Sequence, residues 1–348
     1  MSRFLDCATR ATGLLLAVAC AFPGASGALA RADDTALFEA VRAADLRVAA
    51  IGWRLATANA ALCDRTEAGI GLQLHTLDQF DSGRREAARA YFGFATPVAV
   101  EGVLVGGPAE RAGLRADDSL VRIGSVRIAE LPGRPGTTDR LVAAQLGIGA
   151  LPPEARIEVD AIRAGTPIHL TLQPMRVCKS RFELDLDGGF DASADGAMVQ
   201  IGSGFLDDYP DSQLAAVIAH EFAHNILHHR DRLEARGVDY GLLAGFGANV
   251  KYFRQTEVQA DLLSVYLLAN ANYPARAGVA FWERFGPSKA GGILRSRSHP
   301  AWRDRVATLE AEAAKVETLS SRPLVPAVIT ERGRPLDGDW QSILIRHR

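Results

Sequence analysis

The sequence predicts an α+β protein: a helical core with a small sheet, and a β-rich module inserted into it. Two observations support this fold class. Stretches with apolar residues at helical spacing occupy roughly residues 34–62, 212–229 and 256–271. From about residue 91 to residue 174, short β-branched runs separated by glycines and prolines replace that pattern. The two kinds of stretch are therefore expected to form different parts of the molecule.

Composition fits a globular protein of one large or two moderate domains. The chain has 348 residues, of which 48% are hydrophobic and 23% charged, enough to bury a sizeable core. The net charge is −2, and no basic tract with interleaved aromatic residues occurs. Nucleic acid is therefore not an expected partner.

The N-terminus has the pattern of a secretory signal peptide over residues 1–30. Arg3 and Arg10 precede an apolar run of about a dozen residues, and Ala28–Ala30 supplies the small residues of a cleavage site. A membrane anchor is the alternative, but the run is shorter than the ~20 residues that span a bilayer. A second alternative is a lipoprotein anchored through Cys20, the one route to membrane association that the sequence offers. It ranks lower because Ala17 stands where lipoprotein signals usually have leucine.

Export leaves two cysteines in the mature chain, Cys63 and Cys178. An even pair in an oxidising compartment predicts a disulfide, with two buried free thiols as the alternative. Cys63 closes the N-terminal helix, inside the N-terminal helical part (31–84), and Cys178 ends the β-rich module (85–178). A bond between them makes the module an insertion whose two ends are tied together.

The expected elements of the first half begin with the helix 34–62, in which Leu37, Val41, Leu46, Ile51 and Leu55 lie at helical spacing. The module's β-branched runs are 98–105, 119–128, 155–162 and 167–174. Its two short helices are Pro108–Ala112 and Asp139–Gln145, and Leu131–Arg140 is a loop.

The second half, a core over 179–315, begins with a strand and turn at 197–206. This strand is expected to present a free edge on which an extended peptide can pair. Asp211 is the expected N-cap of the next helix, and a second strong helix covers 256–271. Residues 316–348 have little periodicity and form a C-terminal tail.

The stretch "HEFAH" has the spacing of a metal-binding helix. His220 and His224 are four residues apart, so their rings project from one helix face and reach one ion. Glu221 lies about 100° round the helix, beside the ion without ligating it. H-E-x-x-H is the zinc peptidase pattern for this reason. The alternative is a polar helix face, but apolar flanking residues indicate a buried helix whose imidazoles need partners.

A third ligand is expected from "TEVQAD" on the second helix. Glu257 and Asp261 share one face of a largely apolar helix. Glu257 can ligate the ion, and Asp261 can accept the outer N–H of a ligating histidine. An exposed acidic face is the alternative.

In order, "HEFAH", "EVQAD" and "SHPAWRDRV" resemble the minigluzincin zinc peptidases, the group of HtpX and the CaaX prenyl endopeptidase. The resemblance covers about residues 189–309 and implies one Zn²⁺ held by His220, His224 and Glu257. It implies Glu221 as the base, with Asp261 as the partner of a ligand. His299 and Arg305 match later positions of the family pattern. His299 is either a donor to the reacting oxyanion or a structural histidine, and Arg305 braces the site. Exported bacterial members act on envelope proteins, which implies a periplasmic location.

Residues 91–128 resemble a PDZ domain, most closely in "GGPAERAGLRADDSLVRIGSVRI". The resemblance implies a module that binds peptide C-termini, with Phe92, Gly93 and Phe94 in the carboxylate-binding loop. The alternative is a PDZ-like fold that acts only as a spacer or cover.

Together these patterns predict an exported zinc metalloendopeptidase that acts on unfolded or misassembled envelope polypeptides. A rival hypothesis is a non-catalytic chaperone or adaptor with a structural zinc site. Glu221 argues against it, since a structural site has no need of a base. His228 and His229 are expected to lie off the metal at the end of their helix.

Overall fold

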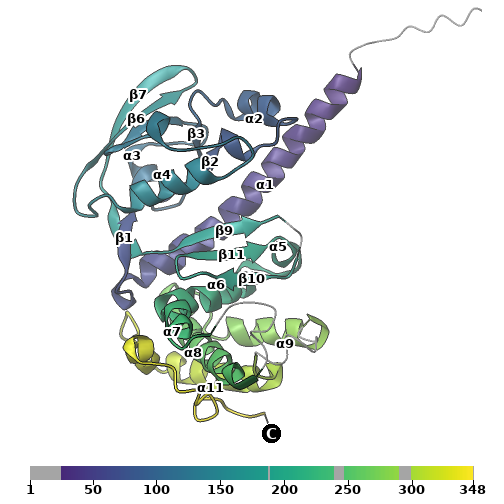
Figure 1. The fold of residues 1–348 in the computed structure, drawn as a ribbon, viewed down its shortest axis with the longest axis vertical. Coiled ribbons are helices and arrows are strands. Elements are labelled where there is room, and N and C mark those ends of the chain that lie inside the picture. Colours follow the sequence, from purple (N-terminus) through teal and green to yellow (C-terminus); the bar gives the residue numbers. More distant parts are fainter. Residues whose placement is uncertain (1–24, 187–188, 239–246, 290–298, 348) are drawn as a thin grey trace, which may run out of the picture.

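A computed structural model describes residues 25–186, 189–238, 247–289 and 299–347. It has 49% helix and 18% strand in several small sheets, which confirms the α+β fold class. Figure 1 shows a β-rich module at one end, a helical core at the other, and α1 running along both. Residues 1–24, most of the expected signal peptide, lie outside the described residues. Among the described helices, none combines the length and the apolar character that a membrane span requires.

Helix α1 (Ala25–Ala58) is the long element that both parts share. Its middle packs closely on each of them. A Cβ placed on Gly102 of the module would lie 2.5 Å from Leu46, and one on Gly52 would lie 2.2 Å from Phe182 of the core. Both contacts require glycine, so the two glycines allow α1 to lie against two sheets.

The module is built on a six-stranded sheet of order β2-β3-β4-β6-β7, with β5 paired to β4. The sequence predicted that this module starts at residue 85, but its edge strand β2 lies before that position. The boundary was misplaced because the pairing of β2 with β3 is a long-range contact that the local sequence pattern does not reveal. Separately, β1 pairs antiparallel with β8 and closes the module. The module's strands are β1 (Thr66–Gly69), β2 (Leu72–Thr76), β3 (Val98–Val103), β4 (Ser119–Ile123), β5 (Val126–Arg127), β6 (Ile157–Arg163), β7 (Thr166–Leu172) and β8 (Met175–Cys178). Its helices are η2 (Leu77–Gln79), α2 (Arg85–Phe92), α3 (Pro108–Ala112), η3 (Ile128–Glu130) and α4 (Asp139–Gly149).

The core has a three-stranded sheet of order β10-β11-β9 packed on helices. The strand expected to present a free edge, β11, is central and paired on both sides, and β10 forms the edge beside α6. The core's strands are β9 (Arg181–Asp185), β10 (Ala192–Ala194) and β11 (Met198–Gly202). Its helices are η1 (Ala60–Leu62), α5 (Gly204–Asp208), α6 (Asp211–Ile226), α7 (His229–Glu234), η4 (Gly247–Asn249), α8 (Val250–Asn270), α9 (Ala277–Lys289), α11 (Trp302–Glu317) and η5 (Ala327–Gly333).

Two helix starts differ from the sequence expectation. Pro210 is the N-cap of α6, and Asp211 is instead the first helical residue. The Asp211 carboxylate is bound by Arg47 of α1 at 2.7 Å, so a tertiary ion pair takes the place of the cap. Helix α8 begins at Val250, six residues earlier than expected. Its first turns lie before the apolar stretch from which the helix was predicted.

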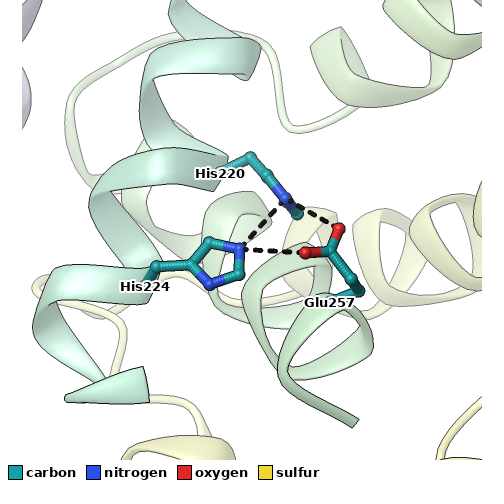
Figure 2. A group of neighbouring side chains, drawn as sticks. All are labelled: His220, His224 and Glu257. Atoms are coloured by element: carbon teal, nitrogen blue, oxygen red, sulfur yellow. Dashed lines mark hydrogen bonds and ion pairs between the residues drawn. The ribbon is translucent and has the colours of Figure 1, made fainter. Parts of the chain in front are cut away.

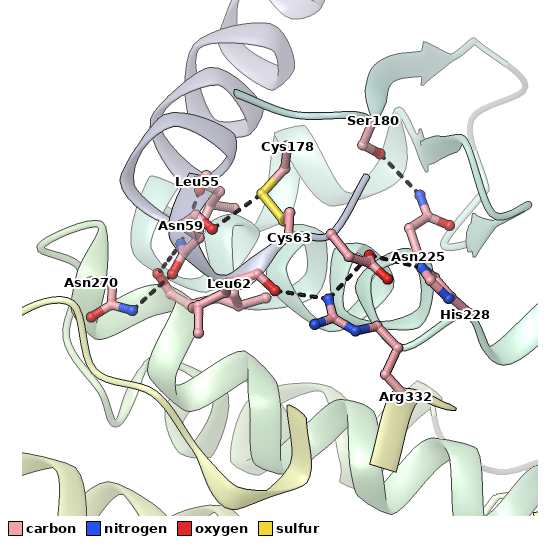
Figure 3. The surroundings of a disulfide bond; sticks show 12 residues. Leu55, Asn59, Leu62, Cys63, Cys178, Ser180, Asn225, His228, Asn270 and Arg332 are labelled. Carbon is pink, nitrogen blue, oxygen red and sulfur yellow. Dashed lines mark hydrogen bonds and ion pairs between the residues drawn. A yellow bond between two sulfur atoms is a disulfide. The ribbon is translucent and has the colours of Figure 1, made fainter. Parts of the chain in front are cut away.

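The predicted disulfide is confirmed: Cys63 and Cys178 are bonded, with their Cα atoms 5.5 Å apart. Figure 3 shows it where α1 ends against the core. Beside it, the fully buried Asn59 donates to the carbonyl oxygen of Leu267 on α8 at 3.1 Å. The disulfide therefore ties the end of the module to the place where α1 meets α8.

Candidate metal centre and peptide groove

Helices α6 and α8 pack against each other and bring the three expected ligands together. The Nε2 atoms of His220 and His224 are 3.3 Å apart. One carboxylate oxygen of Glu257 lies 3.3 Å from His220 Nε2, and the other lies 3.5 Å from His224 Nε2. Figure 2 shows the three side chains converging from the two helices.

This geometry fits a single metal ion. With ligand bonds of about 2.0–2.1 Å, tetrahedral coordination places neighbouring ligand atoms about 3.3 Å apart. The distance between the two Nε2 atoms is 3.3 Å, and each Nε2 atom lies within 3.5 Å of one Glu257 oxygen, though not of the same one. One ligand atom from each residue lies within 4.8 Å of the other two. In addition, Glu257 Oε2 is buried without a hydrogen bond, and its nearest nitrogens are 3.3 Å or more away. Two imidazoles and a carboxylate with a buried, unsatisfied oxygen match the donor set of a divalent cation.

His220 is oriented from behind by Asp261 and Arg305. The Asp261 carboxylate accepts from His220 Nδ1 at 3.0 Å, which directs Nε2 toward Glu257. Arg305 is almost fully buried and donates two hydrogen bonds to Asp261, at 2.6 and 2.7 Å. Burial by itself lowers the pKa of His220, but the hydrogen bond to Asp261 and the nearby Glu257 carboxylate outweigh it and raise the pKa to about 10. A cation that binds here therefore displaces a proton from His220.

His224 is oriented by a chain of hydrogen bonds that the sequence reasoning missed. Arg232 donates to Gln259 Oε1 at 3.0 Å, and His229 Nε2 lies 3.2 Å from the same oxygen. His229 must therefore donate from Nε2, which leaves its Nδ1 as an acceptor. That atom is 2.9 Å from His224 Nδ1. His224 then carries its proton on Nδ1 and presents a bare Nε2 to the ion.

Burial is the main reason that His224 and His229 stay neutral. It lowers the pKa of His224 to about 3 and holds the pKa of His229 well below its usual value. His229 was expected off the metal at the end of its helix. It lies outside the group of three possible ligands, but it is buried and starts α7 instead of ending α6. Its neighbour His228 has a left-handed backbone (φ 52°) and bonds Asp64 at 3.1 Å, away from the ligands.

Glu221 lies beside the three ligands without belonging to them. It lines the same cavity as His220 and Glu257. Burial raises the pKa of Glu221 to about 7, and the charge of His220 offsets only part of that effect. A carboxyl group with such a pKa can both accept and return a proton near neutrality.

A cavity of about 580 Å³ opens in front of this group. His299 lies on its wall, with Nε2 3.4 Å from Glu257 Oε2 and a partly exposed side chain. Its lining combines polar side chains with phenylalanine and tryptophan side chains. Ala192 of the edge strand β10 lies on the rim.

The module has a second candidate site, a groove of about 150 Å³ between β2 and α4. β2 is an edge of the six-stranded sheet. In the preceding turn, the amide groups of Ile70 and Gly71 donate no hydrogen bond within the described residues. Gly71 has φ +72°, and a Cβ there would lie 2.8 Å from Gly107. A strand edge behind two available amides is the arrangement that captures a peptide C-terminus.

The residues expected to capture a carboxylate, Phe92, Gly93 and Phe94, lie elsewhere. Phe92 and Phe94 are buried in an aromatic cluster that includes Phe38 of α1. The amides of Gly93 and Phe94 both donate to the Arg89 carbonyl oxygen and end α2. This geometry does not support peptide capture at Phe92–Phe94. The alternation in Leu72–Thr76 was the available sequence signal for the strand that the groove uses.

No protein-family model matches the chain, and no curated protein matches it. A solved structure that matches part of it is an HtrA-type protease, AlgW, with decapeptide. The sequence identity is 23% and the TM-score is 0.23. The match covers 32% of this chain and 30% of that chain, so the likeness is limited to less than a third of each.

Proposed function

We propose that this protein is an exported zinc metalloendopeptidase of the minigluzincin type, acting on unfolded or misassembled envelope polypeptides. The observation that carries the proposal is the convergence of His220, His224 and Glu257 on one point beside the Glu221 carboxyl group. The disulfide supports an oxidising compartment, for which we propose the periplasm.

A bound Zn²⁺ would polarise the scissile carbonyl and make water a stronger acid. The protein side chains transfer the proton, stabilise the developing charge and orient the ligands. Glu221 takes a proton from the attacking water and delivers it to the leaving amine, so that a C–O bond forms as the C–N bond breaks. His299 faces the same space and donates a hydrogen bond to the carbonyl oxygen as negative charge develops there. Asp261 and Arg305 hold His220 in place.

The substrate backbone is proposed to pair with β10. This strand bonds only β11 within the three-stranded sheet, and it borders the cavity through Ala192. An extended peptide added at this edge runs past the three ligands with its backbone fixed by main-chain hydrogen bonds.

The test is digestion of an unfolded protein by the zinc-loaded chain, with and without a chelator, and by Glu221→Gln. We expect turnover by the wild type alone, with zinc content unchanged in Glu221→Gln. His228→Asn, two residues past the end of the helix that carries Glu221, is the control and is expected to keep full activity. Equal turnover in Glu221→Gln refutes the assigned base. No turnover by zinc-loaded wild type favours the non-catalytic chaperone or adaptor.

For the module we propose capture of peptide C-termini between β2 and α4. Leu146 of α4 lines the groove and is 52% exposed, so Leu146→Arg fills the groove without disturbing the core. Val121→Arg is the control, since Val121 is an exposed apolar residue of the same module outside the groove. Fluorescence anisotropy with pools of C-terminal peptides should show saturable binding that Leu146→Arg abolishes and Val121→Arg retains. No binding to any pool would identify the module as a spacer.

A further inference from the structure

The cavity in front of the ligands is larger and more apolar than hydrolysis itself requires. At about 580 Å³ it falls in the range of sites that enclose a ligand, about 300–1,000 Å³. Part of its lining consists of phenylalanine and tryptophan side chains, which offer water few hydrogen-bond partners.

The aromatic wall is a fixed structure. Phe281 and Phe285 of α9 stack with ring centroids 5.1 Å apart, and Phe205 of α5 lies 6.0 Å from Phe285. Phe190, just before β10, packs edge-on to Phe205 at 5.4 Å. Because Phe205, Phe281 and Phe285 also belong to the main core cluster, the wall is held by the core and does not collapse into the cavity.

Trp282 extends the wall to the metal group. Its ring lies under the Arg305 guanidinium, 4.0 Å from centroid to Cζ. Arg305 in turn holds Asp261 behind His220. The apolar surface therefore begins within one side chain of the ligands, where the residue next to a scissile bond would lie.

We propose that this cavity selects peptides with a large apolar side chain, such as Phe, Leu or Met, next to the scissile bond. The inference rests on the proposed peptidase function and names its substrate class. A side chain of this kind is hidden in folded proteins and exposed in unfolded ones. The cavity thereby distinguishes unfolded polypeptides from native ones by what they expose.

The experiment is cleavage of a matched peptide set by the zinc-loaded full chain, with one central position varied among Phe, Leu, Ala and Asp. Mass spectrometry of the products locates each cut. We expect kcat/KM to favour Phe and Leu over Ala by about 10- to 100-fold, the discrimination that an apolar pocket provides. Equal cleavage of all peptides overturns the inference and leaves the peptidase proposal standing. No cleavage by zinc-loaded wild type removes both.

Variants of Phe190 test whether the aromatic wall of the cavity causes the preference for large apolar side chains. Phe190 is only partly buried, so Phe190→Ala is expected to reduce the Phe-over-Ala preference severalfold while zinc content stays constant. Phe190→Leu keeps an apolar wall and should restore the preference. Phe80→Ala, an equally half-buried aromatic residue of the module, is the control. An unchanged preference in a folded Phe190→Ala, checked by circular dichroism, contradicts the assigned wall. The preference of the wild type tests the inference even if a variant does not fold.

Discussion

His229 determines which nitrogen of His224 faces the metal, and His229→Phe is expected to weaken zinc binding by about 10- to 100-fold. Phenylalanine fills a similar volume at this position, which is 1% exposed. It removes the Nδ1 acceptor that lies 2.9 Å from His224 Nδ1. A buried N–H without an acceptor costs about 1–3 kcal/mol. His224 avoids that cost by carrying its proton on Nε2, where it blocks the metal. The expected loss of affinity corresponds to about 1.4–2.7 kcal/mol, which agrees with that range.

The assay is competition for zinc between the protein and a chromophoric chelator at fixed pH, with helix content checked by circular dichroism. His228→Asn is the matched control, because asparagine tolerates the left-handed backbone of that position and His228 bonds only Asp64 among the described contacts. Its zinc affinity should stay within about twofold of the wild type. The reasoning is refuted if His229→Phe binds zinc as tightly as the wild type, or if both variants lose affinity equally.

Two further predictions concern stability. Replacing Cys63 and Cys178 by serine removes a cross-link that spans 115 positions, and should lower the free energy of unfolding by about 2–5 kcal/mol in urea titrations. A variant as stable as the oxidised wild type would contradict this. Asp45 on α1 lies near Glu183 and Glu101, and burial raises its pKa to about 7. The folded state therefore holds a proton that the unfolded state has lost, so stability should fall as pH rises from about 4 to about 7, by at most about 4 kcal/mol. Asp45→Asn should flatten that slope in urea midpoints measured at pH 5 and pH 8, and an unchanged slope would exclude Asp45 as its source.

The proposed metal ligands, which lie together in the structure, were predictable because their arrangement is local. His220 and His224 are one helical turn apart, as are Glu257 and Asp261, and a helix fixes such pairs without any knowledge of the fold. The pairing of Asp261 with His220 needed only that the two helices face each other. The apolar residues around both motifs indicated that they do, since two buried polar faces must satisfy each other.

The residues that sequence reasoning missed depend on contacts between distant segments. His229 was expected at the end of its helix. The left-handed backbone at His228 instead turns the chain so that the His229 ring contacts the His224 ring. Strand β2 is only five residues long, and it is a candidate for peptide pairing because it lies at the edge of the sheet. The Phe92–Phe94 stretch resembled a binding loop, but packing against Phe38, more than fifty residues earlier, buries it.

Helix α1 connects the module to the core, because it packs into the hydrophobic clusters of both. Its Val48, Ile51 and Leu55 are buried in the main core cluster, whereas Phe38, nearer its start, is buried among the module's aromatic residues. At 1.5 Å per residue, its 34 residues extend about 50 Å, enough to span both parts. The disulfide fixes the other end of the module where α1 meets the core. A module held at both places cannot rotate freely, so the core strand β9 keeps its position beside the groove. For that reason Phe182 and Glu183 of the core line a groove built otherwise mainly from the module.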